Sequence, residues 1–486
     1  MPPRLWTNLA KVKRKGIEQL ATTNIFRQHV KTPFLFLLGV ETFILFASVY
    51  SATYLRINFS QLSSFPTAKS ILINAAIIAV VTPMAMLATG LYQGNTREGM
   101  AGIIIRISVS FVGAVFITAA ISYLMNDIIL GRGIIAIAFI QAFVLIGTLR
   151  FLCLEFIDST KFKKRILVYG AGETASHIDN KLRRTSDRRG FEIVGYMPVE
   201  HQVQRVIESS IIKTELTLLE YVRQMKVDEI VIAISDTSKN IPVEALVNCK
   251  LNGVETINIL SFFEREVGQI RMDIIDPAWL VTSDGFHQSE FQDAVKRVFD
   301  ILASLVILIL ASPFLILTVI AIWIEDGLTA PVFYSQTRVG KSGATFKVYK
   351  FRSMRTDAEK EGAVWASKTD SRITRVGSFI RKTRLDEFPQ IANVLNGSMS
   401  FVGPRPERPE FIEDLAAQIP YYHERHLVKP GVTGWAQLLY PYGASVNDSY
   451  QKQLFDMYYV KNHNLFLDIL ILLQTVEVLL FGKAAR

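Results

Sequence analysis

The chain has 486 residues, half of them hydrophobic, and a formal net charge of +9. Its mean hydropathy of +0.27 is high for a soluble protein, and the apolar residues gather in the first third of the chain. Two cysteines, Cys153 and Cys249, exclude a disulfide framework and a cysteine-based zinc site. No nucleic-acid-binding motif accompanies the positive charge, so we expect membrane lipids and no nucleic acid as partners.

The N-terminal third is predicted to be a membrane domain. Residues 1–32 are basic, and no apolar stretch with a cleavage site follows, so we do not interpret them as a cleaved signal peptide. Residues 33–160 hold four apolar segments of about 20 residues, the length of a transmembrane helix, at 33–55, 70–92, 101–124 and 133–154. Basic residues flank the first and last segments, which places both ends in the cytoplasm. Arg106 is expected to reach the bilayer surface.

Residues 161–290 are predicted to form a soluble α/β domain. The strand patterns RILVYG, FEIVGYMP, VDEIVIAIS and VETINIL alternate with helical patterns, as in a Rossmann-like, doubly wound sheet. The turn from Gly170 to Ala175 matches G-x-G-x-x-A, which alone is a weak dinucleotide signal. Met197 and Pro198 stand where a ribose-binding acid is expected, and no Tyr-x-x-x-Lys pair follows the third strand. A structural or regulatory role is therefore favoured, with an NAD site as the open alternative.

Residues 291–486 are predicted to begin with a helix, 296–325, that enters the membrane and returns. A straight helix over the 27 apolar residues 298–324 would span about 40 Å, enough to cross a bilayer. However, Ser312 and Pro313 interrupt its middle, and basic residues flank both sides. A bend there sends both ends to the cytoplasmic face. Pro313 leaves one carbonyl without its helical N–H, and the Ser312 hydroxyl is a candidate partner.

A globular core is predicted over 326–463. Strands at 332–335 and 345–351 form a hairpin that turns at Gly340 and Gly343. In the loop 427–437, Gly431 and Gly434 are expected to let the backbone approach a ligand. The final apolar segment, 464–482, is predicted to be a helix that either lies at the membrane interface or packs in the core.

The stretch 375–408 carries two adjacent acids, Asp386 and Glu387, between Arg381 and Arg405. A carboxylate can act as nucleophile or metal ligand, and arginine forks bind phosphate, so the pattern is typical of a phosphate-handling site. The alternative is a helix capping box that begins at Thr383. It would put Pro389 inside a helix, so we place that helix at 389–395, ended by Gly397, with its N-terminus toward an anionic ligand. Spacing alone leaves both interpretations open.

Five ordered motifs resemble the bacterial sugar transferase family, that is, polyprenyl-phosphate sugar-1-phosphate transferases, or monotopic phosphoglycosyl transferases. The motifs are KRVFDI…ASP (296–313), KFRSM (350–354), RKTRLDEFPQ (381–390), VGPRPE (402–407) and KPGVTGWAQ (429–437). The first 275 residues are similar to the N-terminal part of long members, and the whole resembles the exopolysaccharide-synthesis type. The expected fold class is thus membrane α/β: a four-helix transmembrane bundle, a Rossmann-like domain, and a monotopic catalytic α+β domain with a re-entrant helix.

The resemblance implies transfer of a sugar-1-phosphate, glucose or galactose, from a UDP-sugar to undecaprenyl phosphate with release of UMP. It implies that Asp386 is the nucleophile that forms a covalent aspartyl-phosphosugar, and that Glu387 deprotonates the acceptor or, with Asp386, holds Mg²⁺. The implied substrate- or phosphate-binding residues are Arg381, Arg405, Lys350, Arg352, Gly431 and Gly434. A homodimer in the bacterial inner membrane, with a cytoplasmic active site, is expected. Arg384 departs from the family pattern, in which a small polar residue is expected.

Two rival functions belong to other classes. A nucleotide-sugar dehydratase fused to a membrane anchor would need a working dinucleotide site at Gly170–Ala175, where the expected acid is missing. A non-catalytic scaffold for polysaccharide assembly would not need the Asp386–Glu387 pair or its two arginines.

Overall fold

The computed structural model forms two compact units, Met1–Val267 and Gly268–Arg486. The structure describes residues 23–25, 28–30, 32–59, 66–92, 99–124, 131–156, 163–182, 188, 190–199, 203–234, 241–275, 283, 285–286, 289–356, 372–441, 443 and 445–481.

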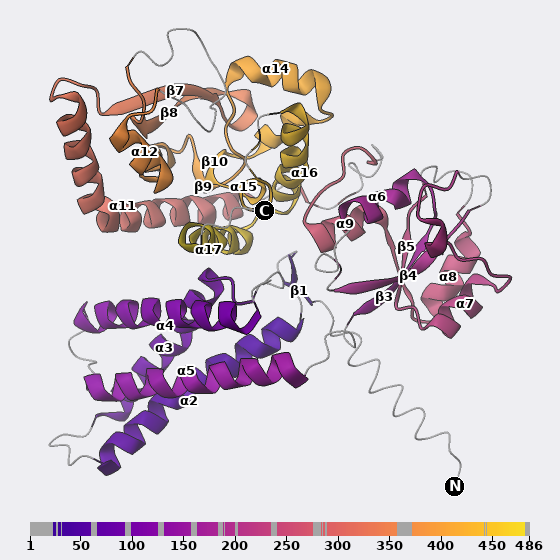
Figure 1. The fold of residues 1–486 in the computed structure, drawn as a ribbon, viewed down its shortest axis with the longest axis horizontal. Coiled ribbons are helices and arrows are strands. Elements are labelled where there is room, and N and C mark those ends of the chain that lie inside the picture. Colours follow the sequence, from indigo (N-terminus) through magenta and orange to yellow (C-terminus); the bar gives the residue numbers. More distant parts are fainter. Residues whose placement is uncertain are drawn as a thin grey trace. The chain divides into compact units, whose positions relative to one another are not determined.

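The first unit contains a bundle of four long helices (Figure 1). After a short hairpin of β1 (Thr23–Ile25) and β2 (Gln28–Val30) come α2 (Thr32–Phe59), α3 (Ala68–Ala88), α4 (Gly99–Leu124) and α5 (Arg132–Phe156). Each helix is long and apolar enough to cross a membrane, which confirms the four predicted helices. Leu45, Ala75, Ile107 and Ala142 pack in the bundle core, whereas Phe36, Phe43 and Phe116 are exposed, as expected of side chains that face lipid.

Charged side chains inside the bundle are paired. Glu41 of α2 accepts hydrogen bonds from Arg150 of α5, at 2.6 Å from Nε and 3.0 Å from Nη2. Arg106 is buried and donates to the carbonyl of Thr89, just beyond the end of α3. The prediction that Arg106 reaches the bilayer surface is therefore wrong, because its side chain is buried inside the bundle. The Thr89 carbonyl can accept this hydrogen bond because it lies at a helix end, where carbonyls lack a helical N–H partner.

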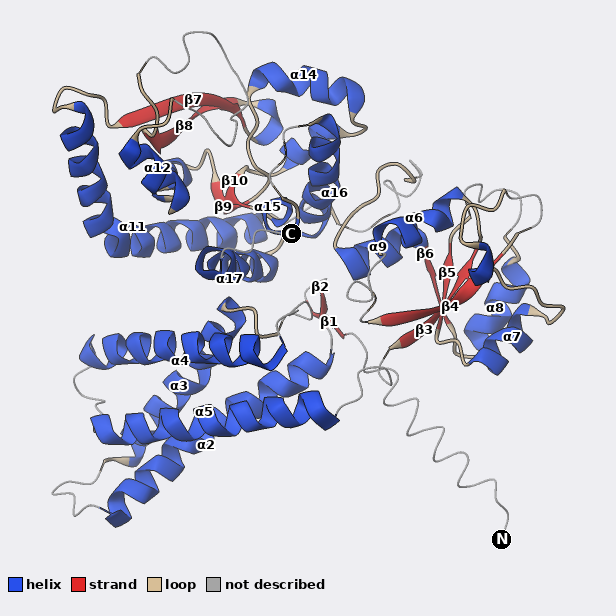
Figure 2. Ribbon diagram, in the orientation of Figure 1, coloured by secondary structure: helices blue, strands red, loops and turns tan. Residues whose placement is uncertain are grey.

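The second part of this unit is the predicted α/β domain. Its four strands, in the order β4-β3-β5-β6, form a parallel sheet. The elements are β3 (Lys164–Tyr169), α6 (Glu173–Lys181), β4 (Phe191–Met197), α7 (Leu218–Met225), β5 (Glu229–Ile232), α8 (Val243–Leu251), β6 (Glu255–Asn258) and α9 (Ile259–Val267). Helices α7 and α8 cover one face of the sheet through Leu167 and Ile230, and α6 and α9 cover the other (Figure 2). All four predicted strands are confirmed.

The second unit begins at Gly268, earlier than the predicted domain boundary at 290/291. The Gly268 carbonyl accepts a hydrogen bond from the indole N–H of Trp435 at 2.9 Å, and the N–H of Ile270 donates to Leu454 at 3.0 Å. Ile270 and Met272 lie in the core of this unit. The attachment of Ile270 and Met272 to this unit therefore depends on contacts distant in sequence.

This unit contains a hairpin of β7 (Phe333–Val339) and β8 (Thr345–Phe351), as predicted, and a parallel pair of β9 (Ser400–Val402) and β10 (Gly431–Thr433). Its helices are α11 (Glu290–Asp326), α12 (Arg375–Lys382), α13 (Gln390–Asn396), α14 (Pro409–Gln418), α15 (Trp435–Leu439), α16 (Val446–Asn462) and α17 (Leu465–Phe481), with the short 3-10 turns η4 (Lys341–Gly343), η5 (Leu385–Glu387) and η6 (Tyr422–Leu427).

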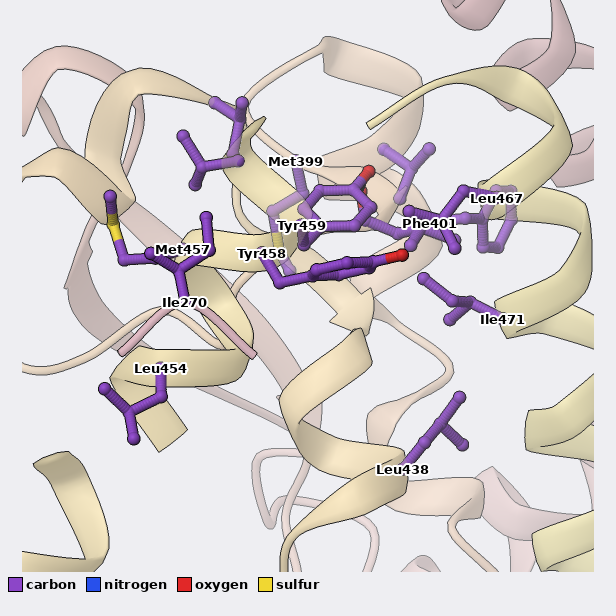
Figure 3. Packing of buried hydrophobic residues seen from close by; sticks show 14 of the residues in the cluster. Ile270, Met399, Phe401, Leu438, Leu454, Met457, Tyr458, Tyr459, Leu467 and Ile471 are labelled. Atoms are coloured by element: carbon purple, nitrogen blue, oxygen red, sulfur yellow. Dashed lines mark hydrogen bonds between the residues drawn. The ribbon is translucent and has the colours of Figure 1, made fainter. Parts of the chain in front are cut away.

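The core of the unit forms around α16, whose Leu454, Met457, Tyr458 and Tyr459 pack against β9 and α17 (Figure 3). From α17, Leu467 and Ile471 are fully buried there. The buried Asp468 carboxylate accepts hydrogen bonds from Lys296 and Tyr459. The C-terminal apolar helix therefore packs in the core, which decides between the two alternatives left open by its sequence.

Helix α11 is a single helix of 37 residues that contains Pro313. Figure 1 shows it running beside α17 and then turning toward the start of β7. The Ser312 hydroxyl donates to the carbonyl of Ile309 at 2.8 Å, the carbonyl that Pro313 leaves without an N–H partner, which confirms the predicted contact. Large apolar side chains such as Leu310 and Ile324 are exposed along its outer face. By length and composition, α11 could also cross a membrane.

Both ends of α11 are attached to the same unit. Near its start, Arg297 donates to the carbonyls of Val394 and Leu395 at the end of α13. Near its end, the carboxylate of Glu325 accepts the N–H groups of Arg375 and Val376, at 2.7 and 2.8 Å. The helix thus leaves the domain and comes back to it, as a re-entrant helix requires.

Candidate active site

The backbone around the acid pair is a helix, a sharp turn and a second helix. The Thr383 hydroxyl donates to the carbonyl of Phe379 at 2.9 Å and closes α12, so the alternative capping box beginning at Thr383 is wrong. Arg384 then adopts the left-handed conformation, with φ of 61°. Pro389 precedes α13, and Gly397 ends that helix with φ of 86°, close to the predicted 389–395.

Glu387 is the anion of a charged cluster built from three segments. Its Oε1 accepts hydrogen bonds from Lys350 of β8 at 2.9 Å and from Arg405, in the loop after β9, at 3.2 Å. Arg384 lies 3.8 Å from Oε2. Burial disfavours the charged carboxylate, but the charges of Arg405 and Lys350 outweigh it and hold the pKa of Glu387 well below its usual range. The cluster therefore keeps Glu387 ionised.

Asp386 has a different environment. Asp386 is only 8% exposed, and its Oδ1 has no hydrogen-bond partner among the described residues. Burial and the charge of Glu387 raise the pKa of Asp386, and Lys350, Arg381 and Arg384 offset part of that rise. The Nη1 of Arg381 is likewise buried with no hydrogen-bond partner in the described part of the chain. Buried polar atoms are normally paired, so the unpaired Oδ1 of Asp386 and the unpaired Nη1 of Arg381 make this place a candidate ligand-binding site.

The structure brings Lys350, Arg381 and Arg405 to the acid pair but places Arg352 elsewhere. The Nη2 of Arg352 donates to the carboxylate of Asp326 at 2.6 Å and so holds the end of α11. Only Phe351 lies between Lys350 and Arg352 in sequence, but β8 ends at Phe351, and the two side chains therefore have different surroundings.

Gly431 and Gly434 contact protein backbone. A Cβ on Gly431 would stand 2.1 Å from the nitrogen of Gly403, and one on Gly434 would stand 2.2 Å from the oxygen of Gly403. Both glycines therefore let β10 approach the loop that carries Arg405, so their effect on the site passes through that loop.

Two polar residues that sequence reasoning missed also support the site. The buried Asn393 of α13 donates to the carbonyl of Lys347 at 2.7 Å and accepts the N–H of Tyr349 at 3.0 Å, which ties α13 to the strand that carries Lys350. Gln437 accepts a hydrogen bond from Arg405 at 3.4 Å. Asn393 could have been found from the sequence, because it is a polar residue on the apolar side of a short helix.

The site fits a metal ion only if a ligand brings most of its coordination. Within the described residues, no group of three or more His, Cys, Asp or Glu side chains could hold a metal ion. The site does offer the unpaired Oδ1 of Asp386, next to Glu387. Mg²⁺ is often held by one or two carboxylates together with substrate phosphates, so the donor set fits a phosphate-borne Mg²⁺.

Comparisons with known proteins place this site in a family. The bacterial sugar transferase family matches residues 291–482, which include the whole charged cluster. A Bacillus subtilis relative, a putative undecaprenyl-phosphate N-acetylgalactosaminyl 1-phosphate transferase, is 53% identical over 132 residues, which are 27% of this chain and 73% of the relative. The chain belongs to the bacterial sugar transferase family. The resemblance seen in the sequence motifs is confirmed.

Two longer matches extend beyond the catalytic unit of this sugar transferase. A UDP-N-acetylgalactosamine-undecaprenyl-phosphate N-acetylgalactosaminephosphotransferase of Aeromonas hydrophila is 40% identical over 241 residues, 50% of this chain and 56% of the relative. A UDP-glucose:undecaprenyl-phosphate glucose-1-phosphate transferase of Xanthomonas campestris is 28% identical over 415 residues, 81% of this chain and 84% of the relative. A CoA-binding domain family matches residues 87–256, which contain most of the α/β domain.

Proposed function

We propose that this sugar transferase moves a sugar-1-phosphate from a UDP-sugar to undecaprenyl phosphate and releases UMP, as a membrane step of polysaccharide synthesis. The relatives' names support the reaction class. The observation that carries the proposal is the unpaired, buried carboxylate oxygen of Asp386, next to Glu387 and near Arg381. Such a carboxylate can attack phosphorus, and the cations around it can receive a diphosphate.

In the first half-reaction, a carboxylate oxygen of Asp386 attacks the β-phosphorus of the UDP-sugar. A bond forms between Asp386 and that phosphorus, the bond from the phosphorus to the bridging oxygen breaks, and UMP leaves with the electron pair. Arg381 and Arg405 offset the charge on the phosphoryl oxygens in the transition state. The raised pKa of Asp386 makes its ionised form a stronger nucleophile than an ordinary aspartate.

In the second half-reaction, a phosphate oxygen of undecaprenyl phosphate attacks the same phosphorus. The bond to Asp386 breaks, and the carboxylate is restored. Glu387 is a poor general base because its pKa is held well below the usual range, so we assign it to positioning Lys350 and Arg405 rather than to deprotonating the acceptor.

We propose that Asp386 and Glu387 hold Mg²⁺ together with the diphosphate of the substrate. When bound there, Mg²⁺ would supply positive charge to the diphosphate oxygens. Lys350 and Arg405 donate to Oε1 of Glu387, and Arg384 lies 3.8 Å from its Oε2, whereas Oδ1 of Asp386 has no hydrogen-bond partner among the described residues. Asp386 would therefore be the main protein ligand, with Glu387 beside it.

We propose that α11 enters and leaves the bacterial cytoplasmic membrane on its cytoplasmic side. Three observations support this: the bend near Pro313, the attachment of both helix ends to one unit, and the exposed apolar outer face. Such a helix holds the site at the level of the lipid headgroups, where the phosphate of the acceptor lies. A homodimer remains a prediction.

The sugar is the open part of the proposal. The sequence resemblance favours glucose or galactose, and the relatives' names give glucose, galactose and N-acetylgalactosamine. The test is a UMP-release assay on the purified full chain with undecaprenyl phosphate, Mg²⁺ and, in turn, UDP-glucose, UDP-galactose and UDP-N-acetylgalactosamine. With at least one of the three sugars, we expect UMP release that continues beyond a single turnover only when the lipid is present. A folded protein that releases UMP with none of them would contradict the proposal and favour the scaffold.

A further inference from the structure

The loop that carries Arg405 is held by its carbonyl groups. Arg405 stands between Pro404 and Pro406, which have no backbone N–H, so only Arg405 and Glu407 have backbone donors in the stretch 404–407. Every carbonyl from residue 404 to residue 407 accepts a hydrogen bond. Two of the donors are backbone N–H groups: Gly431 bonds to Pro404 and Val339 bonds to Glu407, each at 3.0 Å.

The other two donors are arginine side chains. The Nη2 of Arg425 donates to the carbonyl of Arg405 itself at 3.1 Å. The Nη1 of Arg338 donates to the carbonyl of Pro406 at 3.2 Å. These arginines come from η6 and β7, so elements distant in sequence hold two adjacent carbonyls, those of Arg405 and Pro406, and the Arg405 side chain contacts Glu387.

Arg425 is itself firmly placed. Its guanidinium is buried, and it donates to the Tyr422 hydroxyl at 2.6 Å and to the Asp456 carboxylate at 2.8 Å. It also stacks over the Tyr422 ring, 5.0 Å from the ring centre. A lysine could keep the ion pair with Asp456, but its single ammonium group cannot reproduce this planar set of donors.

We propose that Arg425 and Arg338 are positioning residues of the transferase reaction. They hold the Pro404–Arg405–Pro406 loop by its carbonyls, so that the Arg405 side chain reaches Glu387 and the diphosphate. The inference rests on the proposed function, because it concerns the placement of a residue of that same site. Neither arginine needs to touch the substrate.

The alternative is that the two arginines only stabilise the fold. A double-mutant cycle distinguishes the two roles. If Arg425 or Arg338 acts through Arg405, its substitution should slow UMP release less when Arg405 is already changed. The variants are Arg425→Lys, Arg338→Lys, Arg405→Lys and the two double variants with Arg405→Lys. Arg265→Lys is the control, since Arg265 is a buried arginine paired with Glu229 in the α/β domain.

The first measurement is the rate of UMP release by the full chain in detergent, with undecaprenyl phosphate and saturating UDP-sugar. The second is the thermal unfolding of each variant, which shows whether it is folded. We expect Arg425→Lys to slow release roughly 10- to 100-fold, the scale of a small misplacement of a catalytic group. Arg338→Lys should give a smaller loss, since its side chain is 20% exposed and it bonds to the carbonyl of Pro406 rather than to that of Arg405. Arg265→Lys should leave the rate unchanged.

In the Arg405→Lys background, Arg425→Lys and Arg338→Lys should slow release by less than about threefold, which would support positioning through Arg405. Losses of the same factor in both backgrounds would overturn the inference. If Arg425→Lys fails to fold, the cycle with Arg338→Lys decides by the same criterion. Unchanged rates in both single variants would overturn only the positioning role, whereas a wild type that releases no UMP would remove the proposed function as well.

Discussion

Two motifs in this chain match ligand-binding patterns, and their surroundings differ. In the α/β domain, protein fills the space around the turn at Gly170. The Gly170 N–H donates to Met197 and the Ala171 carbonyl accepts from Arg205, both at 2.8 Å. A Cβ on Gly170 would stand 2.3 Å from the carbonyl oxygen of Ala233. At the acid pair, by contrast, the buried Oδ1 of Asp386 and the buried Nη1 of Arg381 have no hydrogen-bond partner among the described residues.

The difference shows how to judge whether a sequence motif marks a ligand-binding site. A glycine turn can be conformationally demanding because strands pack closely, without any ligand. Polar atoms that the fold buries and does not pair are more informative, since burial without a hydrogen bond costs free energy that a ligand can recover. By this criterion the acid pair is a better candidate for a reaction site than the Gly170 turn, which disfavours the dehydratase alternative.

The largest effect should follow from Asp386→Asn. Without the nucleophile, UMP release should fall by roughly 10⁴-fold or more, the scale seen when a catalytic nucleophile is removed. Because burial raises the pKa of Asp386, its ionisation costs stability at neutral pH, so Asn should leave the unfolding temperature unchanged or raise it. The measurements are the UMP-release rate and thermal unfolding. A matched Glu173→Gln variant, at the start of α6 next to the glycine turn, should keep wild-type turnover.

A pair of glycine substitutions tests the comparison itself. Gly434→Ala should slow turnover about 10- to 100-fold, because its Cβ would stand 2.2 Å from the Gly403 oxygen and displace the Arg405 loop. Gly170→Ala should instead destabilise the α/β domain by about 2 kcal/mol or more, because φ is +121° there and the Cβ would meet Ala233. Rates and unfolding curves of both variants are required. The comparison fails if Gly170→Ala lowers turnover in protein that remains folded and Gly434→Ala does not.

The pH dependence of the first half-reaction should change when Glu387 is replaced. Asp386 must be ionised to attack, so the rate of UMP release without acceptor falls as the pH falls through the pKa of Asp386, which is raised in the fold. The charge of Glu387 is the second cause of that rise, after burial. Glu387→Gln should therefore move the acid limb of the pH–rate profile to lower pH, along with a slower maximal rate. A limb that moves to higher pH would contradict the assigned charges.

The smallest effect is expected at Arg384. This residue holds φ of 61°, a conformation that costs a residue with a Cβ about 1 kcal/mol and that glycine adopts freely. Arg384→Gly should thus raise the free energy of unfolding of the catalytic unit by up to that amount, offset by the greater freedom of glycine in the unfolded chain. Chemical denaturation measures the change. Arg384→Ala, which keeps the strain, is the control and should not be stabilising.

Much of the fold could be predicted because it depends on local patterns. The four apolar helices follow from length and hydropathy, and the strands of the α/β domain follow from runs of branched residues between turns. The contact of Ser312 with Ile309 follows from helix geometry alone, since Pro313 frees the carbonyl four residues before it.

The parts that escaped prediction depend on contacts distant in sequence. Arg352 pairs with Asp326 rather than with the acid pair, and nothing in the local spacing distinguishes it from Lys350. The segment from Gly268 joins the catalytic core through Trp435 and Leu454, which lie far along the chain. The turn at Arg384 also could not be expected, because a charged residue rarely adopts positive φ.

The central claim is that Asp386 carries the phosphosugar between the two half-reactions. The most direct test is intact-protein and peptide mass spectrometry of the full chain after incubation with Mg²⁺ and the UDP-sugar that supports turnover, in the absence of undecaprenyl phosphate. We predict release of UMP and a gain of one phosphosugar on the peptide that contains Asp386, which is lost when the lipid acceptor is added. A wild type that turns over with acceptor but never carries a phosphosugar, or carries it on another residue, would contradict the account.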